Sequence, residues 1–262
     1  MISPWTSTGT LTVAGKALEY LCLGPPPSEA PTLVLLHEGL GCVQLWRDMP
    51  AALTNATGFG VFAYSRAGYG QSDAAELPRP LDYMTVEATN VLPEVLNAIG
   101  VQNVILLGHS DGATIAAIYA GCVDDQRVQG VVLIAPHFFT EPAGLKEIAK
   151  ARDAYQNGDL RTRLAKYHHD PDNAFCGWND SWLDPEFRKW DVSDVLDNIQ
   201  VPVLAIQGRD DPYGTLAQID AITARVRQAP VTTLIPDDCR HAPHLEHGAR
   251  VVTAIAGFCG QI

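Results

Sequence analysis

Asn103-Val-Ile-Leu-Leu-Gly108-His109-Ser110-Asp111-Gly112-Ala-Thr-Ile-Ala-Ala-Ile118 is the stretch of sequence that decides the fold. An apolar run as long as a buried strand leads directly into Gly-x-Ser-x-Gly, and a helical pattern follows at once. A sharp turn between strand and helix strains the backbone of the serine and pushes its hydroxyl out of the sheet. Glycine on both sides removes side chains that would collide with neighbouring backbone. This context predicts that Ser110 is a nucleophile at a helix N-terminus, which stabilises negative charge.

The rest of the chain alternates between two kinds of segment. Continuous apolar runs predict strands buried on both faces of a parallel sheet at residues 32–36, 60–64, 103–107, 130–135, 203–207 and 231–235. Between them, helical patterns occur at residues 43–57, 83–99, 112–121, 215–227 and 247–258. Two short alternating runs, residues 10–14 and 18–23, predict an antiparallel hairpin before the first buried strand. The alternation predicts an α/β fold with a doubly wound, mostly parallel sheet.

One connection between two predicted strands is too long for this alternation. More than sixty residues separate the apolar run that ends at residue 135 from the one that starts at residue 203. They have helical patterns and many aromatic side chains, and a simple crossover needs far fewer residues. We therefore expect residues 137–198 to form an inserted helical cap, with residues 1–136 and 199–262 as the core. Extra helices packed on one flank of the core remain the alternative.

Composition limits the partners. The 262 residues carry 18 Lys and Arg against 30 Asp and Glu, a formal net charge of −12. Nucleic acid and anionic membranes both attract concentrated positive charge, so we expect neither as a partner. With 47% hydrophobic and 18% charged residues the balance is that of a soluble globular protein. The oligomeric state is left open.

The lack of a recognisable targeting signal and the spacing of the cysteines favour a cytoplasmic location. No basic segment followed by an apolar run is seen at the start of the sequence, and no apolar stretch reaches the ~20 residues of a spanning helix. The six cysteines lie far apart without a Cys-x-x-Cys. In such a chain, reduced and mostly buried thiols are expected rather than a disulfide framework.

The turn around Ser110, with its flanking strand and helix, resembles the α/β-hydrolase superfamily, and the resemblance extends over nearly the whole chain. It implies a chain order of nucleophile, acid and histidine, each at the carboxyl end of a strand. The acid commonly stands three residues after a glycine that ends its strand, which implies Asp211 after Gly208. Asp210 remains the alternative; its other roles would be to cap the next helix or to pair with Arg209.

The resemblance also implies the base. Members often carry a Gly-His-x-Pro-like segment after the last strand, and Arg240-His241-Ala242-Pro243 matches it with arginine in place of glycine. His241 would take the proton of Ser110, while Asp211 would fix the tautomer of the imidazole. His244 and His247 follow at three-residue steps, but no further ligand supports a metal site. We therefore expect no metal and no cofactor, and a packed or hydrogen-bonded role for His244.

Two backbone N–H groups are implied as an oxyanion hole. His37-Glu38-Gly39-Leu40-Gly41 resembles the His-Gly-x-Gly segment of the superfamily, which implies N–H donors from Gly39 and, after the nucleophile, from Asp111.

Glu38 stands where glycine is usual, although a carboxylate there would oppose an oxyanion. We expect Glu38 to point away from the hole and anchor its loop, because buried charges are usually paired; pairing with Arg66 or Arg240 and substrate selection are the alternatives. Arg66 itself is expected to tie loops together.

A substrate pocket is expected between Ser110 and the cap. Its candidate residues are Glu38, Leu40, His109, His137, Phe138, Trp178, Trp182 and His244. At least half of the aromatic side chains in the cap are expected to form its own core. His168 and His169 are expected at the solvated surface.

The remaining aromatics favour an apolar or aromatic acyl compound as the small-molecule substrate. The sequence predicts a serine esterase or lactonase that works through an acyl-enzyme. Carbon–carbon bond hydrolysis, thioester hydrolysis and a hydrolase-like receptor with little turnover are the alternatives.

Overall fold

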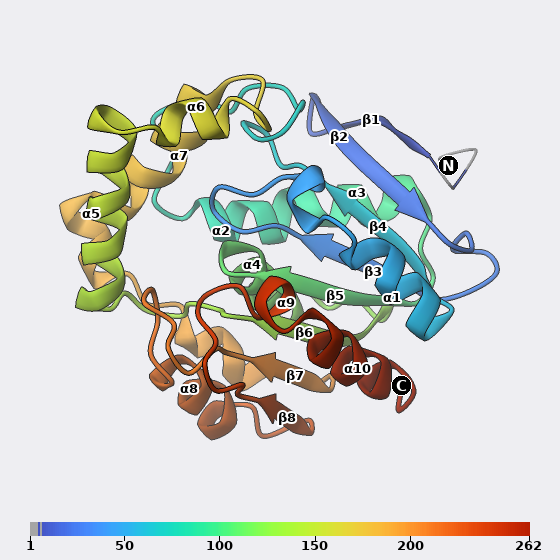
Figure 1. The fold of residues 1–262 in the computed structure, drawn as a ribbon. Helices are drawn as coiled ribbons and strands as arrows, with labels where there is room; N and C mark the ends of the chain where they lie inside the picture. Colours follow the sequence, from blue (N-terminus) through green and yellow to red (C-terminus); the bar gives the residue numbers. More distant parts are fainter. Residues whose placement is uncertain (1–4, 6) are drawn as a thin grey trace.

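An eight-stranded β-sheet runs through the middle of the molecule (Figure 1), seen in a computed structural model that describes residue 5 and residues 7–262. Its strands are β1 (Thr8–Val13), β2 (Lys16–Leu23), β3 (Thr32–Leu36), β4 (Gly60–Tyr64), β5 (Val104–His109), β6 (Val128–Ile134), β7 (Val203–Ile206) and β8 (Val231–Leu234). They lie in the order β1-β2-β4-β3-β5-β6-β7-β8. The pairs β1–β2 and β2–β4 are antiparallel and the other neighbours are parallel. The predicted hairpin and the mostly parallel sheet are thus confirmed.

Helices cover both faces of the sheet. One face carries α1 (Met49–Thr57) and α10 (Gly248–Cys259), which pack on each other. The other face carries α2 (Tyr83–Val86), η2 (Glu87–Val91), α3 (Leu92–Ile99), α4 (Asp111–Cys122) and α8 (Ala217–Arg225). Because successive side chains of a strand point to opposite faces, Leu35 and Leu107 belong to one apolar cluster, whereas Val34 and Leu106 belong to the other.

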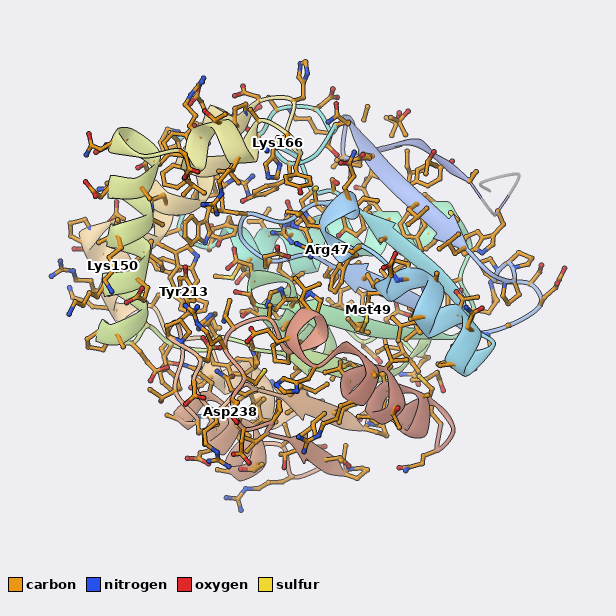
Figure 2. All side chains as sticks on the ribbon, viewed as in Figure 1. Arg47, Met49, Lys150, Lys166, Tyr213 and Asp238 are labelled. Carbon is orange, nitrogen blue, oxygen red and sulfur yellow. The ribbon has the colours of Figure 1, made fainter. Side chains whose placement is uncertain are left out.

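The long connection between β6 and β7 is helical. It contains α5 (Pro142–Asn157), α6 (Leu160–Leu164), α7 (Pro171–Leu183), η3 (Pro185–Lys189) and η4 (Ser193–Asn198). Helices α5, α6 and α7 lie together at one end of the molecule, and the exposed Lys150 and Lys166 are on this segment (Figure 2). Some of its rings pack on each other: Tyr155 stacks on Phe175 with centroids 3.8 Å apart, and Phe187 stacks on Trp190 at 5.0 Å.

Two expected helices differ in detail. The segment 43–57 is split into η1 (Val43–Trp46) and α1, with Arg47 at φ 50° between them. Pro50 explains the break, since its ring would clash with the carbonyl of Trp46 in a continuous helix and it has no N–H to donate. The segment 83–99 is helical throughout, but its middle turn, η2, is a π-helix just before Pro93, which likewise has no N–H.

The last strand is less buried than predicted. Residues 231–235 were expected to be covered on both faces, yet β8 is the edge strand, and Thr232 and Thr233 are exposed. An edge strand has a neighbour on one side only, so fewer elements cover its side chains.

The cysteines match the expectation. All six are free, and four of them, Cys22, Cys42, Cys239 and Cys259, are buried. Within the described residues, none of the helices combines the length and the hydropathy of a membrane span.

Candidate active site

Ser110 lies on the predicted turn between β5 and α4. Its backbone has φ 52° and ψ −119°, the left-handed region that an L-residue adopts only under strain. The turn requires the flanking glycines, because a Cβ at Gly108 would collide with the carbonyl of Gly112, and one at Gly112 with the carbonyl of Leu36. The Ser110 N–H donates to the carbonyl oxygen of Ile134 at 2.8 Å. The strand, the strain and the tight backbone contacts together fix the direction of the hydroxyl.

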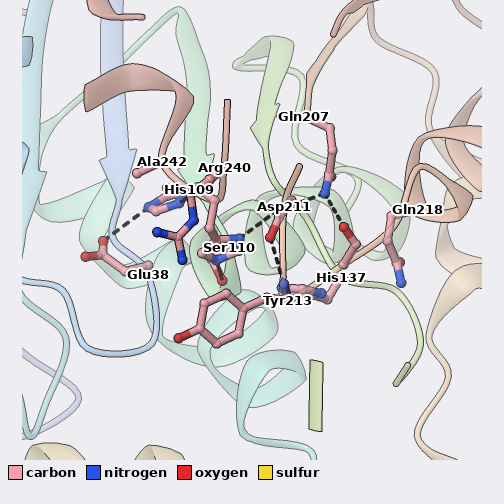
Figure 3. A network of polar contacts seen from close by, with 12 residues as sticks. Glu38, His109, Ser110, His137, Gln207, Asp211, Tyr213, Gln218, Arg240 and Ala242 are labelled. Atoms are coloured by element: carbon pink, nitrogen blue, oxygen red, sulfur yellow. Dashed lines mark hydrogen bonds and ion pairs between the residues drawn. The ribbon is translucent and has the colours of Figure 1, made fainter. Parts of the chain in front are cut away.

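Ser110, His241 and Asp211 form one hydrogen-bonded chain (Figure 3). Nε2 of His241 lies 3.0 Å from Oγ of Ser110, and Nδ1 of His241 lies 2.8 Å from Oδ2 of Asp211. The Asp211 side chain is fully buried and the His241 side chain is 18% exposed. Burial raises the pKa of Asp211, but its hydrogen bond to His241 and the charge of that ring lower the pKa by more. The pKa of Asp211 therefore lies below its usual value. The arrangement suits transfer of the Ser110 proton to His241.

Asp211, rather than its neighbour, faces the histidine. Its carboxylate also accepts hydrogen bonds from Gln207 Nε2 and from the N–H of Tyr213, both at 2.8 Å. Asp210 is exposed. Arg209, the expected partner of Asp210, instead pairs with Asp237 at 2.5 Å.

Arg66 supports the loop of residues 37–41, which we call the Gly39 loop. The guanidinium, 1% exposed, donates to the backbone carbonyls of His37 and Glu38 at 2.5 and 3.1 Å. A second support is His168, whose ring bonds the carbonyl of Leu40 at 3.1 Å. His168 is 2% exposed, so its expected place at the surface is wrong, because the loop supplies polar partners for a buried ring.

Two backbone donors remain free beside Ser110. The N–H groups of Gly39 and Asp111 donate no hydrogen bond to any residue that the structure describes. Both residues line the same cavity as Ser110. Asp111 is the first residue of helix α4, so its N–H carries the partial positive charge of the helix N-terminus.

The cavity has a volume of about 120 Å³ and is mostly apolar. Of the expected pocket residues, Glu38, Leu40, His137, Trp178 and Trp182 line it. Ile148 of α5 and Tyr213 line it too and were not predicted; Tyr213 is visible between α5 and the core in Figure 2. Tyr213 follows the acid by two residues, a sequence signal that was available, whereas nothing in the sequence singles out Ile148.

Three expected pocket residues lie away from the cavity. Phe138 is fully buried in the apolar core, with its backbone N–H bonded to Gln218 Oε1 at 2.8 Å. His109 and His244 are buried behind the Ser110–His241 pair, with their rings 4.5 Å apart. The sequence pattern places these residues near the ends of strands, but it does not give the direction of their side chains.

The family model described as "alpha/beta hydrolase fold" matches residues 31–177. The chain belongs to the α/β hydrolase fold family.

Its relatives include several hydrolases. It is 26% identical over 217 residues to the bifunctional esterase/perhydrolase DCH of Acinetobacter calcoaceticus, covering 71% of this chain and 76% of the relative. It is 30% identical over 128 residues to epoxide hydrolase B of Mycobacterium tuberculosis, covering 49% of this chain and 35% of that enzyme. The solved enol-lactonase from Burkholderia xenovorans LB400 has a TM-score of 0.75 at 21% identity, with 95% of this chain and 99% of the other covered. The family and these relatives support hydrolase activity.

Glu38 of this hydrolase has a different partner from the one expected. Its carboxylate lies 3.4 Å from Nδ1 of His109, whereas Arg66 bonds only its backbone carbonyl. Among the described residues, no ion pair joins Glu38 to Arg240, and the ion-pair partner of Glu38 is His109. The two pairings are therefore wrong, and the reason is tertiary: His109 ends β5, which lies next to β3, and so meets Glu38 at the start of the neighbouring loop.

The three histidines that follow the last strand do not converge. His241 faces Ser110, the His244 ring packs on Trp46 at 5.3 Å, and His247 Nε2 lies 3.3 Å from the carbonyl of Asp238. Burial and the neighbouring His109 lower the pKa of His244 to about 3, so its ring is neutral. In the described part of the chain, no three His, Cys, Asp or Glu side chains gather in a way that could hold a metal ion.

Proposed function

We propose that this α/β hydrolase is a serine hydrolase that cleaves a small carboxylic ester or lactone through an acyl-enzyme on Ser110. The observation that carries the proposal is the Ser110–His241–Asp211 chain at the wall of an apolar cavity, with free N–H groups at Gly39 and Asp111. Nucleophile, base, orienting acid and oxyanion donors are the four parts that acyl transfer needs.

The first half-reaction forms the acyl-enzyme. Oγ of Ser110 attacks the carbonyl carbon while Nε2 of His241 takes the hydroxyl proton. Asp211 accepts a hydrogen bond from Nδ1 and so keeps Nε2 free to act as the base. The carbonyl oxygen becomes negative and is stabilised by the N–H groups of Gly39 and Asp111; one such donor contributes roughly 3–4 kcal/mol to the transition state.

The acyl-enzyme is complete when His241 returns the proton to the alkoxy oxygen of the substrate, whose bond to the carbonyl carbon breaks. The second half-reaction restores Ser110. A water molecule then gives a proton to His241 and attacks the acyl carbon, and Ser110 leaves with that proton. The products are a carboxylic acid and an alcohol, or one hydroxy acid from a lactone, and no cofactor enters the balance.

The small volume of the cavity favours a short substrate. We propose that residues 137–198 act as a cap, because Ile148, Trp178 and Trp182 of this segment close the cavity over Ser110. A dry apolar cavity of about 150 Å³ holds benzene, so the volume here, about 120 Å³, suits a short acyl chain or a small ring.

The test is active-site labelling combined with turnover. We expect a fluorophosphonate to add one label to the wild type, none to Ser110→Ala and one to Ser28→Ala, in which an exposed serine is changed. We expect Ser110→Ala to lower kcat for p-nitrophenyl acetate by a factor on the order of 10⁴ or more. Wild-type protein that takes no label and has the same turnover as Ser110→Ala would overturn the proposal. Labelled protein that cleaves only thioesters or vinylogous diketones would replace the ester with another bond.

A further inference from the structure

Behind the proposed catalytic serine lies an ion pair that the proton-transfer chain does not use. The carboxylate of Glu38, at the start of the loop after β3, is 3.4 Å from Nδ1 of His109. The His109 side chain is 4% exposed and that of Glu38 is 28% exposed. His109 is the residue directly before Ser110, so this contact joins the Gly39 loop to the strand of the nucleophile.

The other nitrogen of His109 reaches a third segment. Nε2 of His109 lies 2.8 Å from the backbone carbonyl oxygen of His241. Both ring nitrogens therefore face acceptors, a carboxylate on one side and a carbonyl on the other. A neutral imidazole has only one N–H, whereas the imidazolium donates on both sides. A protonated His109 therefore satisfies both acceptors at once.

The charges around His109 agree with this protonation state. Burial disfavours the charged ring, but the hydrogen bond and charge of Glu38, followed by the carbonyl of His241, raise the pKa of His109 above its usual value. Glu38 stays ionised, because the hydrogen bond and charge of His109 outweigh its own burial and lower its pKa. The other titratable groups that face His109 are His241, at 5.1 Å between ring centroids, His244 at 4.5 Å, and Asp211. His244 is neutral and adds no repulsion.

We propose that Glu38 and His109 form a positioning pair, which holds the loop of His241 in register with Ser110 and with the Gly39 N–H. The inference rests on the proposed function. The His109 imidazolium holds the carbonyl of His241, and Glu38 holds the imidazolium. The buried His109 side chain thus sets the spacing of Ser110, His241 and the Gly39 loop.

The His241 loop needs such a support. It carries Arg240 in place of the usual glycine, and Asp238 has a left-handed φ of 52°. On the outer side Glu246 accepts the N–H groups of Arg240 and Ala242 at 2.9 and 3.3 Å. On the inner side the carbonyl of His241 bonds His109. The pair also explains why a carboxylate is tolerated beside the proposed oxyanion hole: the adjacent imidazolium neutralises it.

The first measurement needs no variant of Glu38. In ¹⁵N-histidine-labelled protein, NMR shifts distinguish an imidazolium from a neutral ring, and His109→Gln assigns the signal. We expect both His109 nitrogens of the wild type to carry protons at pH 7 and to lose one only at a pH above the usual range of a histidine. A neutral His109 ring at pH 7 would overturn the inference, whether or not the Glu38 variants fold.

The second measurement is a pH profile of turnover. Glu38→Gln keeps the size of the side chain and removes its charge. We expect it to lower kcat for p-nitrophenyl acetate on the order of 10- to 100-fold with little change in KM, because a small displacement of a reacting group has an effect of this size. We also expect the remaining activity to fall at a lower pH on the alkaline side than in the wild type, since His109 deprotonates earlier. Glu38→Asp should retain much of the wild-type profile.

The control is Glu76→Gln, which removes an exposed carboxylate elsewhere and should behave as the wild type. A Glu38→Gln protein with the wild-type kcat and pH profile contradicts the positioning pair. If in addition fluorophosphonate still labels Ser110 of the wild type, the proposed function stands without the pair. If the wild type takes no label, the proposed function itself fails, so the two failures are distinct.

Discussion

The phenol of Tyr83 donates a hydrogen bond to the buried carboxyl group of Asp111. The indole N–H of Trp182 donates in turn to the Tyr83 oxygen, 3.1 Å away. Burial raises the pKa of the Asp111 carboxyl, against the opposing charge of Arg66. Tyr83 therefore connects helix α7 to the first residue of helix α4, whose N–H faces the cavity.

Removing this phenol should destabilise the fold. In Tyr83→Phe both Asp111 and Trp182 lose a buried partner, so we expect the free energy of unfolding to fall by about 1–3 kcal/mol. The matched control is Tyr64→Phe, because the Tyr64 hydroxyl is buried without a partner in the described chain and its loss should change stability little. Urea unfolding of both variants is the measurement, and equal losses would contradict the role given to Tyr83.

The choice of acid can be tested on neighbouring residues. Asp211→Asn should lower kcat by a factor on the order of 10⁴, because an amide no longer holds the required tautomer of His241. Asp210→Asn changes an exposed side chain and should leave kcat nearly unchanged. Steady-state kinetics on a short ester give both values. A comparable loss in Asp210→Asn would reassign the acid.

The size of the acyl group should respond to Trp178. Its indole covers Gly39 so closely that a Cβ on Gly39 would collide with the ring. Trp178→Ala should enlarge the cavity and shift preference from acetyl toward hexanoyl and octanoyl esters, seen as a reversal in relative kcat/KM. Trp190→Ala truncates a ring that stacks on Phe187 away from the cavity, and it should keep the acetyl preference. An unchanged chain-length profile in Trp178→Ala would remove Trp178 from the substrate site.

Acid should destabilise the protein partly through His137. Burial, with the charge of His241, lowers the pKa of this ring from 6.5 to about 3. Between these values the unfolded chain binds a proton that the native ring does not, so stability falls as the pH drops below 6.5, by up to about 1.4 kcal/mol per pH unit for one group. We expect His137→Phe to flatten the fall of stability between pH 6.5 and pH 4, measured by urea unfolding. A slope as steep as that of the wild type would show that His137 is not the group involved.

His137 also makes a prediction about recognition. Its ring is 5% exposed, lines the cavity and has no hydrogen-bond partner within residues 5 and 7–262. We expect His137→Phe to lower kcat/KM for an ester with a hydroxyl or keto group near the carbonyl by about tenfold, the effect of one lost hydrogen bond. The unsubstituted ester should show no such loss. The ratio of the two values checks this, and equal losses for both esters would contradict it.

The sequence predicted most of the framework because it depends on local patterns. Apolar runs bounded by turn residues identified the strands, and Gly-x-Ser-x-Gly after a strand identified the turn at Ser110. The predicted helices at residues 43–57 and 83–99 differ from the observed ones because each contains a proline. Pro50 and Pro93 alter these helices although the apolar pattern continues through them. Burial of the last strand was overestimated, because a sequence does not say which strand lies at the edge.

Contacts between distant segments were decided by the tertiary structure alone. The sequence by itself determined a doubly wound sheet and the strained serine turn, and the resemblance to a known family implied the order of serine, acid and histidine along the chain. Only the folded molecule turned Asp211 toward His241 and Asp210 toward solvent, and paired Glu38 with His109 rather than with Arg66 or Arg240. The reason is physical: local periodicity fixes which residues form an element, whereas the partner of a buried charge depends on which strand ends meet at the edge of the sheet.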